Sequence, residues 1–229
     1  LEACVFSYNK ELTTARIASS TTGLGTFEND SLLSSVIFEP TVKEIDTLAF
    51  YNCDNLTTID IPASVDFIGA GAFSNAHGKS MSIVVNPDNA CYSSVHGILF
   101  NKDQTKIVYY PAFEKSYTIP STVKTVGSCA FYNDAINSIT IPASVISLER
   151  EAFREIFDTC SITFNPGSTL REINDEAFCV GGITAINIPS TVKTIGIASF
   201  LDCFLLQSIA IPASVDTIKP LAFVGCVSL

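Results

Sequence analysis

The sequence is poor in several residue types on which common functions depend. Its 229 residues include no tryptophan, one methionine and two histidines, and only 16% of the residues are charged. The two histidines, His77 and His96, are each followed by glycine. A Ser-His-Asp or Cys-His catalytic centre would require the fold to bring one of these two histidines next to a nucleophile by chance. We therefore expect both histidines in loops and predict that the chain is not an enzyme of these classes.

Basic runs and long apolar runs are missing as well. Thirteen lysine and arginine residues face 23 aspartate and glutamate residues, which gives a net charge of −10. Without a basic cluster there is no counterion release to drive nucleic-acid binding, so DNA, RNA and anionic membranes are disfavoured as partners. No stretch approaches the roughly 18 consecutive apolar residues of a membrane span. Leu1 does not begin a basic and then apolar leader.

The eight cysteines contain no Cys-x-x-Cys pair, which argues against a zinc or thioredoxin-like site. We predict neither a metal nor a cofactor. Cys53, Cys203 and Cys226 each follow a recurrent phenylalanine by three residues, and this phasing predicts structural, mostly buried and reduced thiols. Cys203 and Cys226 would lie one repeat apart, so a disulfide between them stays open as the less favoured alternative.

What the sequence contains in quantity is repetition. Residues 208–223 read Ser-Ile-Ala-Ile-Pro-Ala-Ser-Val-Asp-Thr-Ile-Lys-Pro-Leu-Ala-Phe, and related copies occupy residues 58–73, 138–153 and 185–200. The markers recur with a typical spacing of 22 to 25 residues, which indicates a solenoid. They are Pro40, Pro62, Pro120, Pro142, Pro166, Pro189 and Pro212, and Phe50, Phe73, Phe131, Phe153, Phe178, Phe200 and Phe223.

Each repeat begins with an alternating apolar run such as Ile59-Asp60-Ile61, the pattern of a half-buried strand. Proline directly after the run cannot donate a ladder hydrogen bond, so it ends the strand. The second half has apolar residues three to four apart, as at Val65 and Ile68, which predicts an irregular or short-helical arm. The fold class predicted is an α/β solenoid with one parallel sheet.

We expect residues 1–229 to form a single solenoid domain of about nine repeats, cut from a longer array. Residues 1–27 are a degenerate repeat. Residues 74–112 are a longer, insert-type repeat. Within it, residues 98–100 and 106–110 read as two strands joined by the polar turn 101–105, which predicts a hairpin.

From about Leu33 onward, these repeats resemble leucine-rich repeat proteins of the BspA-like type. The resemblance rests on Ile-x-Ile-Pro-(Ala/Ser)-(Ser/Thr)-Val-x-x-Ile-x-x-x-Ala-Phe, on its variant at residues 162–178, and on the insert from Asn89 to Pro111. It implies a leucine-rich repeat array with its sheet on the concave face and its arms on the convex face. It also implies a cell-surface or secreted protein of bacteria or parasitic protists, often associated with adhesion. The family has no shared catalytic residues to transfer.

Alternation places small, mostly polar side chains on the strand face that points away from the core, with Ile37 as an apolar exception. We predict that this face binds a protein or glycoprotein partner, although exposed strand positions favour serine and threonine in any case. The predicted binding residues are Thr58, Asp60, Ser138, Thr140, Ser161, Thr163, Asn187 and Ser208.

The function predicted is a non-enzymatic interaction module at the cell surface or outside the cell, adhering to host or matrix glycoproteins. One alternative is a passive spacer that presents another domain. A second is a carbohydrate-active solenoid enzyme, although no facing carboxylate pair is recognisable. The densest acidic cluster, around Glu172, Asp175 and Glu176 with Glu149, Glu151 and Glu155, is interpreted as a solvated arm.

Overall fold

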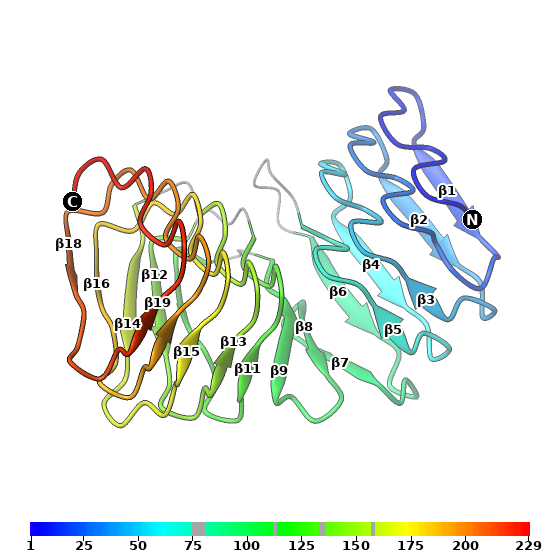
Figure 1. The fold of residues 1–229 in the computed structure, drawn as a ribbon. Helices are drawn as coiled ribbons and strands as arrows, with labels where there is room; N and C mark the ends of the chain where they lie inside the picture. Colours follow the sequence, from blue (N-terminus) through cyan, green and yellow to red (C-terminus); the bar gives the residue numbers. More distant parts are fainter. Residues whose placement is uncertain (75–80, 112–113, 133–135, 157–158) are drawn as a thin grey trace. The chain divides into compact units, whose positions relative to one another are not determined.

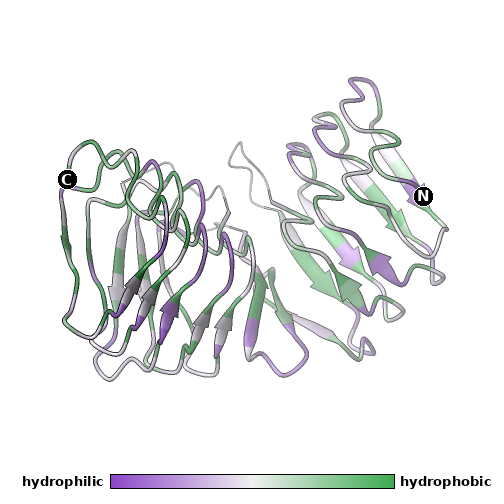
Figure 2. Ribbon diagram, viewed as in Figure 1, coloured by the Kyte–Doolittle hydropathy of each residue, from purple (hydrophilic) through white to green (hydrophobic). Residues whose placement is uncertain are grey.

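The computed structural model describes residues 1–74, 81–111, 114–132, 136–156 and 159–229 (Figure 1). The chain divides into two compact units, Leu1–Pro111 and Ala112–Leu229. In each unit, hydrophobic residues recur coil after coil along the strands (Figure 2). The single domain expected over residues 1–229 stays a prediction.

In the first unit, each coil begins with a four-residue strand that alternates between the core and solvent. These first strands pair in parallel as β1 with β2 and as β4 with β6, and the short second strands pair as β3 with β5. The strands are β1 (Thr14–Ile17), β2 (Ser35–Phe38), β3 (Glu44–Ile45), β4 (Thr58–Ile61), β5 (Phe67–Ile68) and β6 (Ser82–Val85).

The insert completes the first unit with three antiparallel strands, β7 (Tyr92–Val95), β8 (Ile98–Asn101) and β9 (Lys106–Tyr109). The predicted hairpin is therefore confirmed as β8 and β9. The additional strand β7 joins β8 through a two-residue turn in which His96 and Gly97 both have positive φ, as such a tight turn requires. His96 thus lies in a loop as expected, whereas His77 lies outside the described residues.

The second unit repeats the two-strand coil in a more regular form. Its first strands form the parallel sheets β10-β12-β14 and β16-β18, and its second strands pair in parallel from β11 to β19. The strands are β10 (Ser116–Thr118), β11 (Thr125–Val126), β12 (Ser138–Ile141), β13 (Ser147–Leu148), β14 (Ser161–Phe164), β15 (Glu172–Ile173), β16 (Ala185–Asn187), β17 (Thr194–Ile195), β18 (Ser208–Ala210) and β19 (Thr217–Ile218).

The solenoid and its parallel strands are as predicted, but the α/β class is wrong: the fold is a β-solenoid, and of the irregular or short-helical arms expected, the helical alternative is contradicted. The part of the chain that the structure describes contains no helix. In seven turns of the described residues, two residues of positive φ lie four positions apart, on either side of the phenylalanine at Phe6, Phe27 or a marker position. A two-residue strand precedes the turn in the coils of β3, β13, β15, β17 and β19. A left-handed residue interrupts a right-handed helix, so the arm cannot be helical. The pairs are Cys4 and Tyr8, Gly25 and Asn29, Leu48 and Asn52, Glu151 and Glu155, Glu176 and Val180, Ala198 and Asp202, and Leu221 and Gly225.

The core of each unit is a column of stacked phenylalanine rings, one from each coil. In the second unit, the Phe153 ring lies 5.0 Å from that of Phe131 and 5.3 Å from that of Phe178, centroid to centroid. Phe27 and Phe50 stack in the same way in the first unit, at 5.2 Å. Parallel rings at this distance add packing energy to the burial of apolar area, so the column joins each coil to the next.

The residue three places after the phenylalanine forms a second column. The thiols of Cys53, Cys203 and Cys226 donate hydrogen bonds to the backbone oxygen of the phenylalanine one coil earlier, at 3.0 to 3.1 Å. In the coil of Phe27, the residue at this position is Asp30, and it is fully buried. Its Oδ1 accepts a hydrogen bond from the backbone N–H of Asn9, while its Oδ2 has no partner within the described residues. Burial raises the pKa of the Asp30 carboxyl to about 6.

We expect Phe153→Ala to lower the free energy of unfolding by about 3–5 kcal/mol, because it removes a buried ring with a stacked ring on each side. The matched control is Phe223→Ala, since Phe223 is half-buried and stacks on Phe200. Urea unfolding of both variants measures the difference. Equal losses would show that the ring column does not hold the coils together.

We expect the folded chain to lose stability through Asp30 as the pH rises from about 4 to about 6. The folded-state pKa lies above the ordinary aspartate pKa of 3.8, so the folded state keeps the proton more tightly and is favoured while the carboxyl is protonated. Asp30→Asn should therefore gain stability relative to the native chain across this window. Urea midpoints at pH 4 and pH 7 test this, with the exposed Asp66→Asn as the control for lost charge. A constant difference between Asp30→Asn and the native chain would contradict it.

Candidate functional site

The candidate site is built on the outward positions of the first strands. In β4, Ile59 and Ile61 are buried while Thr58 and Asp60 are exposed, as strand alternation requires. The proline that follows ends the strand, so each coil offers two outward side chains, at its first and third strand positions. We call this surface the outer strand face. The alternation within each repeat is sufficient to predict which residues lie on this surface.

In the second unit, the outer strand face carries two rows of hydroxyl groups across β10, β12 and β14. Register places Ser116, Ser138 and Ser161 in one row, and Thr118, Thr140 and Thr163 in the other. The Ser138 hydroxyl donates a hydrogen bond to that of Ser116 at 2.7 Å. The structure thus brings together four of the predicted residues, Ser138, Thr140, Ser161 and Thr163.

The other predicted residues lie elsewhere. Asn187 and Ser208 belong to the separate sheet β16-β18, and Thr58 and Asp60 belong to the first unit. The prediction omitted Ser116 and Thr118, which extend the two rows. Their segment Ser116-Tyr-Thr-Ile-Pro120 has the same phase as Ser138-Ile-Thr-Ile-Pro142, so the repeat alone could have identified them.

The first-strand sheet divides between β2 and β4, and again between β14 and β16. At both places a longer coil precedes a shorter one. The longer coils have one residue between the strand and the proline, as in Phe38-Glu39-Pro40 and Phe164-Asn165-Pro166. In the shorter coils the proline follows the strand residue directly, as in Ile61-Pro62 and Ile188-Pro189. The extra residue donates its backbone N–H to the coil before, as Asn165 does to Ile141 at 2.9 Å. Proline at this position does not end a ladder by itself, since β12 pairs with β10 although Pro142 follows Ile141 directly. Both divisions coincide instead with the change from a longer coil to a shorter one.

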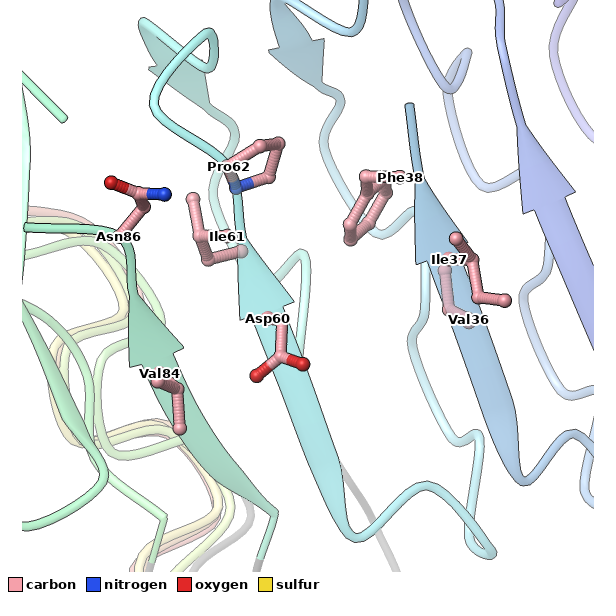
Figure 3. Close-up of a pocket in the computed structure, with 8 residues that line it drawn as sticks. All are labelled: Val36, Ile37, Phe38, Asp60, Ile61, Pro62, Val84 and Asn86. Carbon is pink, nitrogen blue, oxygen red and sulfur yellow. The ribbon is translucent and has the colours of Figure 1, made fainter. Parts of the chain in front are cut away.

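The division between β2 and β4 opens a groove of about 410 Å³ (Figure 3). Side chains that would be covered in a continuous sheet, Val36 and Phe38, reach its floor, where Ile61 joins them. Its rim carries Ile37, Asp60 and Val84. Pro62 and Asn86 complete the lining. This groove was not predicted, although the change in coil length at this place is visible in the spacing of the prolines.

The acidic cluster of the second unit is not simply a solvated arm, because its carboxylates bind the coil beside them. Glu176 accepts hydrogen bonds from Arg150 at 2.7 Å and from Arg154 at 2.6 Å, which joins adjacent coils. Lys219 pairs with Glu172 at 3.1 Å across two coils. Partly exposed ion pairs of this kind contribute modestly to stability, so we assign the cluster a structural role.

Comparison with known families identifies the repeat. The family of BspA type leucine rich repeat regions matches in six copies, over residues 1–79 and 104–229. The chain belongs to this family. The resemblance read from the motif is thereby confirmed, and the degenerate first repeat is included in the match. The unmatched residues contain β6, the β7-β8 hairpin and the turn between them, where the simple BspA-type repeat gives way to the insert.

Solved structures agree with the BspA-type assignment. A leucine-rich cell surface protein of Faecalibacterium prausnitzii is 28% identical with a TM-score of 0.83, covering 100% of this chain and 61% of its own. The pneumococcal vaccine antigen PcpA is 22% identical with a TM-score of 0.76, covering 92% of this chain and 54% of its own, and shows the fold alone. A comparison with curated proteins finds no match. The BspA-type chain therefore spans about three-fifths of the F. prausnitzii protein.

Neither a metal-binding cluster nor a membrane-spanning helix occurs in the described residues. No group of three histidine, cysteine, aspartate or glutamate side chains is placed to hold a metal ion there. The same part of the BspA-type chain has no helix that is long and apolar enough to cross a bilayer.

Five of the eight cysteines are buried: Cys53, Cys129, Cys160, Cys179 and Cys203. Burial raises the pKa of the Cys53 thiol above its ordinary value and that of the Cys203 thiol to about 12. Since the thiolate is the reactive form, these positions are chemically protected as well as inaccessible. Their hydrogen bonds to the preceding coil make them part of the BspA-type scaffold.

We expect native-state maleimide labelling to modify the exposed Cys4 rapidly and to leave Cys53 and Cys203 unmodified until the chain is denatured. Peptide mass mapping of samples labelled with and without urea measures this site by site. Cys4 serves as the internal control for reagent activity. Native labelling of Cys53 at the rate of Cys4 would contradict the buried placement.

Proposed function

We propose that this chain is a non-enzymatic protein-interaction module of a cell-surface or secreted BspA-type protein, and that it adheres to host or matrix glycoproteins. Membership of the family and the likeness to a leucine-rich cell surface protein support the surface location. Leucine-rich repeat solenoids present extended surfaces that suit protein partners.

The observation that carries the proposal is the pair of hydroxyl rows on β10, β12 and β14. In parallel strands the backbone fixes the spacing of these side chains, and the buried residues beneath, such as Ile139, hold the strands in place. Serine and threonine lose little rotamer freedom on binding and both donate and accept hydrogen bonds. A partner surface rich in hydroxyl or amide groups, as in a glycoprotein, matches this chemistry.

The test is the double variant Thr140→Arg with Thr163→Arg. These neighbours are in register on β12 and β14, so two arginines would cover the hydroxyl rows with bulk and like charge without entering the core. We expect saturable binding to a panel of matrix and host-surface glycoproteins to fall at least about tenfold, a loss of about 1.4 kcal/mol.

The matched control is Thr194→Arg with Thr217→Arg, a register pair on the second strands β17 and β19. It adds the same charge to the same unit but not to the outer strand face, and we expect it to keep binding. Thermal unfolding of both double variants confirms that the fold is intact. Equal binding by both variants would reject the hydroxyl rows as the docking surface, and absence of binding by the native chain would favour the spacer.

A further inference from the structure

The groove between β2 and β4 departs from the repeat in the chemistry of its rim. In the second unit, the third strand position carries Thr140, Thr163 and Asn187. The corresponding residues of successive coils in the first unit are Ile37, Asp60 and Val84. Ile37 is 54% exposed and Val84 is 49% exposed, so two branched apolar side chains face water on either side of a carboxylate.

Asp60 stands between these two side chains. Register pairs Asp60 with Val84 on β6, and Ile37 lies on β2 across the division of the sheet (Figure 3). No hydrogen bond or ion pair of the Asp60 carboxylate occurs within the described ranges. Arg16, the cation at the same strand position on β1, already pairs with Glu39. The groove therefore combines an apolar floor and rim with one negative charge that the unit does not neutralise.

We infer that this groove binds an arginine side chain of a protein partner. The inference rests on the proposed protein-interaction function but assigns a different surface, in the other unit. An arginine stem has three methylene groups that pack on Ile37 and Val84, and its planar guanidinium donates two parallel hydrogen bonds to the Asp60 carboxylate. The net charge of −10 favours the approach of a basic segment.

Other occupants match the groove less well. An anionic ligand would meet the unneutralised Asp60 carboxylate, and a purely apolar side chain would bury that charge without a partner. Lysine offers a longer stem, but its ammonium is more strongly hydrated and forms no bidentate pair with a carboxylate. We therefore expect the groove to bind arginine more tightly than lysine, and lysine more tightly than glutamine.

The test is a nuclear magnetic resonance titration of the native chain with three capped tripeptides, Val-Arg-Val, Val-Lys-Val and Val-Gln-Val. We expect saturable amide shifts from the arginine peptide at residues 36–38, 60–62 and 84–86. The glutamine peptide should bind about tenfold more weakly, because it cannot pair with the carboxylate. Raising the salt concentration should weaken the arginine complex and not the glutamine complex.

Asp60→Asn should reduce the affinity for the arginine peptide about tenfold, and Asp66→Asn, which removes an exposed charge outside the groove, should leave it unchanged. Equal affinity for the arginine and glutamine peptides, or unchanged affinity in Asp60→Asn, would overturn the inference. Self-association abolished by Asp60→Asn would also overturn it, by making a second copy of the chain the occupant. None of these results bears on the Thr140 and Thr163 variant, so failure of this inference is distinguishable from failure of the proposed function.

Discussion

The structure of each unit depends on the contact between one coil and the next. A single coil has two short strands and one phenylalanine, and it cannot bury its own apolar face. Stacking places the Phe178 ring between those of Phe153 and Phe200, at 5.3 and 5.2 Å. Hydrogen bonds also join these coils, from the Phe178 backbone N–H to the Ser199 oxygen and from the Cys203 thiol to the Phe178 oxygen. The residues that repeat most faithfully are therefore those that face the neighbouring coil.

The outer strand face is free of this constraint, and there the coils differ from one another. Hydroxyl rows on β10, β12 and β14 give the second unit a polar, evenly spaced surface. The ladder is interrupted between β2 and β4, where a coil with one extra residue before its proline precedes a shorter coil, and the first unit has there an apolar groove with the Asp60 carboxylate at its rim. A small change in repeat length thus alters local surface chemistry without disturbing the phenylalanine column.

Much of this fold could be predicted from the sequence, because strand alternation and the proline and phenylalanine markers have direct physical consequences. The core residues, the first strands and the β8-β9 hairpin followed from them. Of the two arm conformations left open, irregular or short-helical, the helical one was wrong, because a three- to four-residue apolar spacing suggests a helix and residues such as Glu151 or Val180 do not indicate a positive φ. The outward rows were predicted in part, but no single repeat shows which strands share a sheet, because the two divisions coincide with a change in length from one coil to the next.

Cross-linking mass spectrometry of the intact chain with a glycoprotein that it binds tests the central claim most directly, because it locates the partner on the surface. We expect cross-links from the partner to residues beside the outer strand face, such as Lys115 next to β10. Cross-links confined to the second strands and the turns, for example at Lys193 and Lys219, would contradict it.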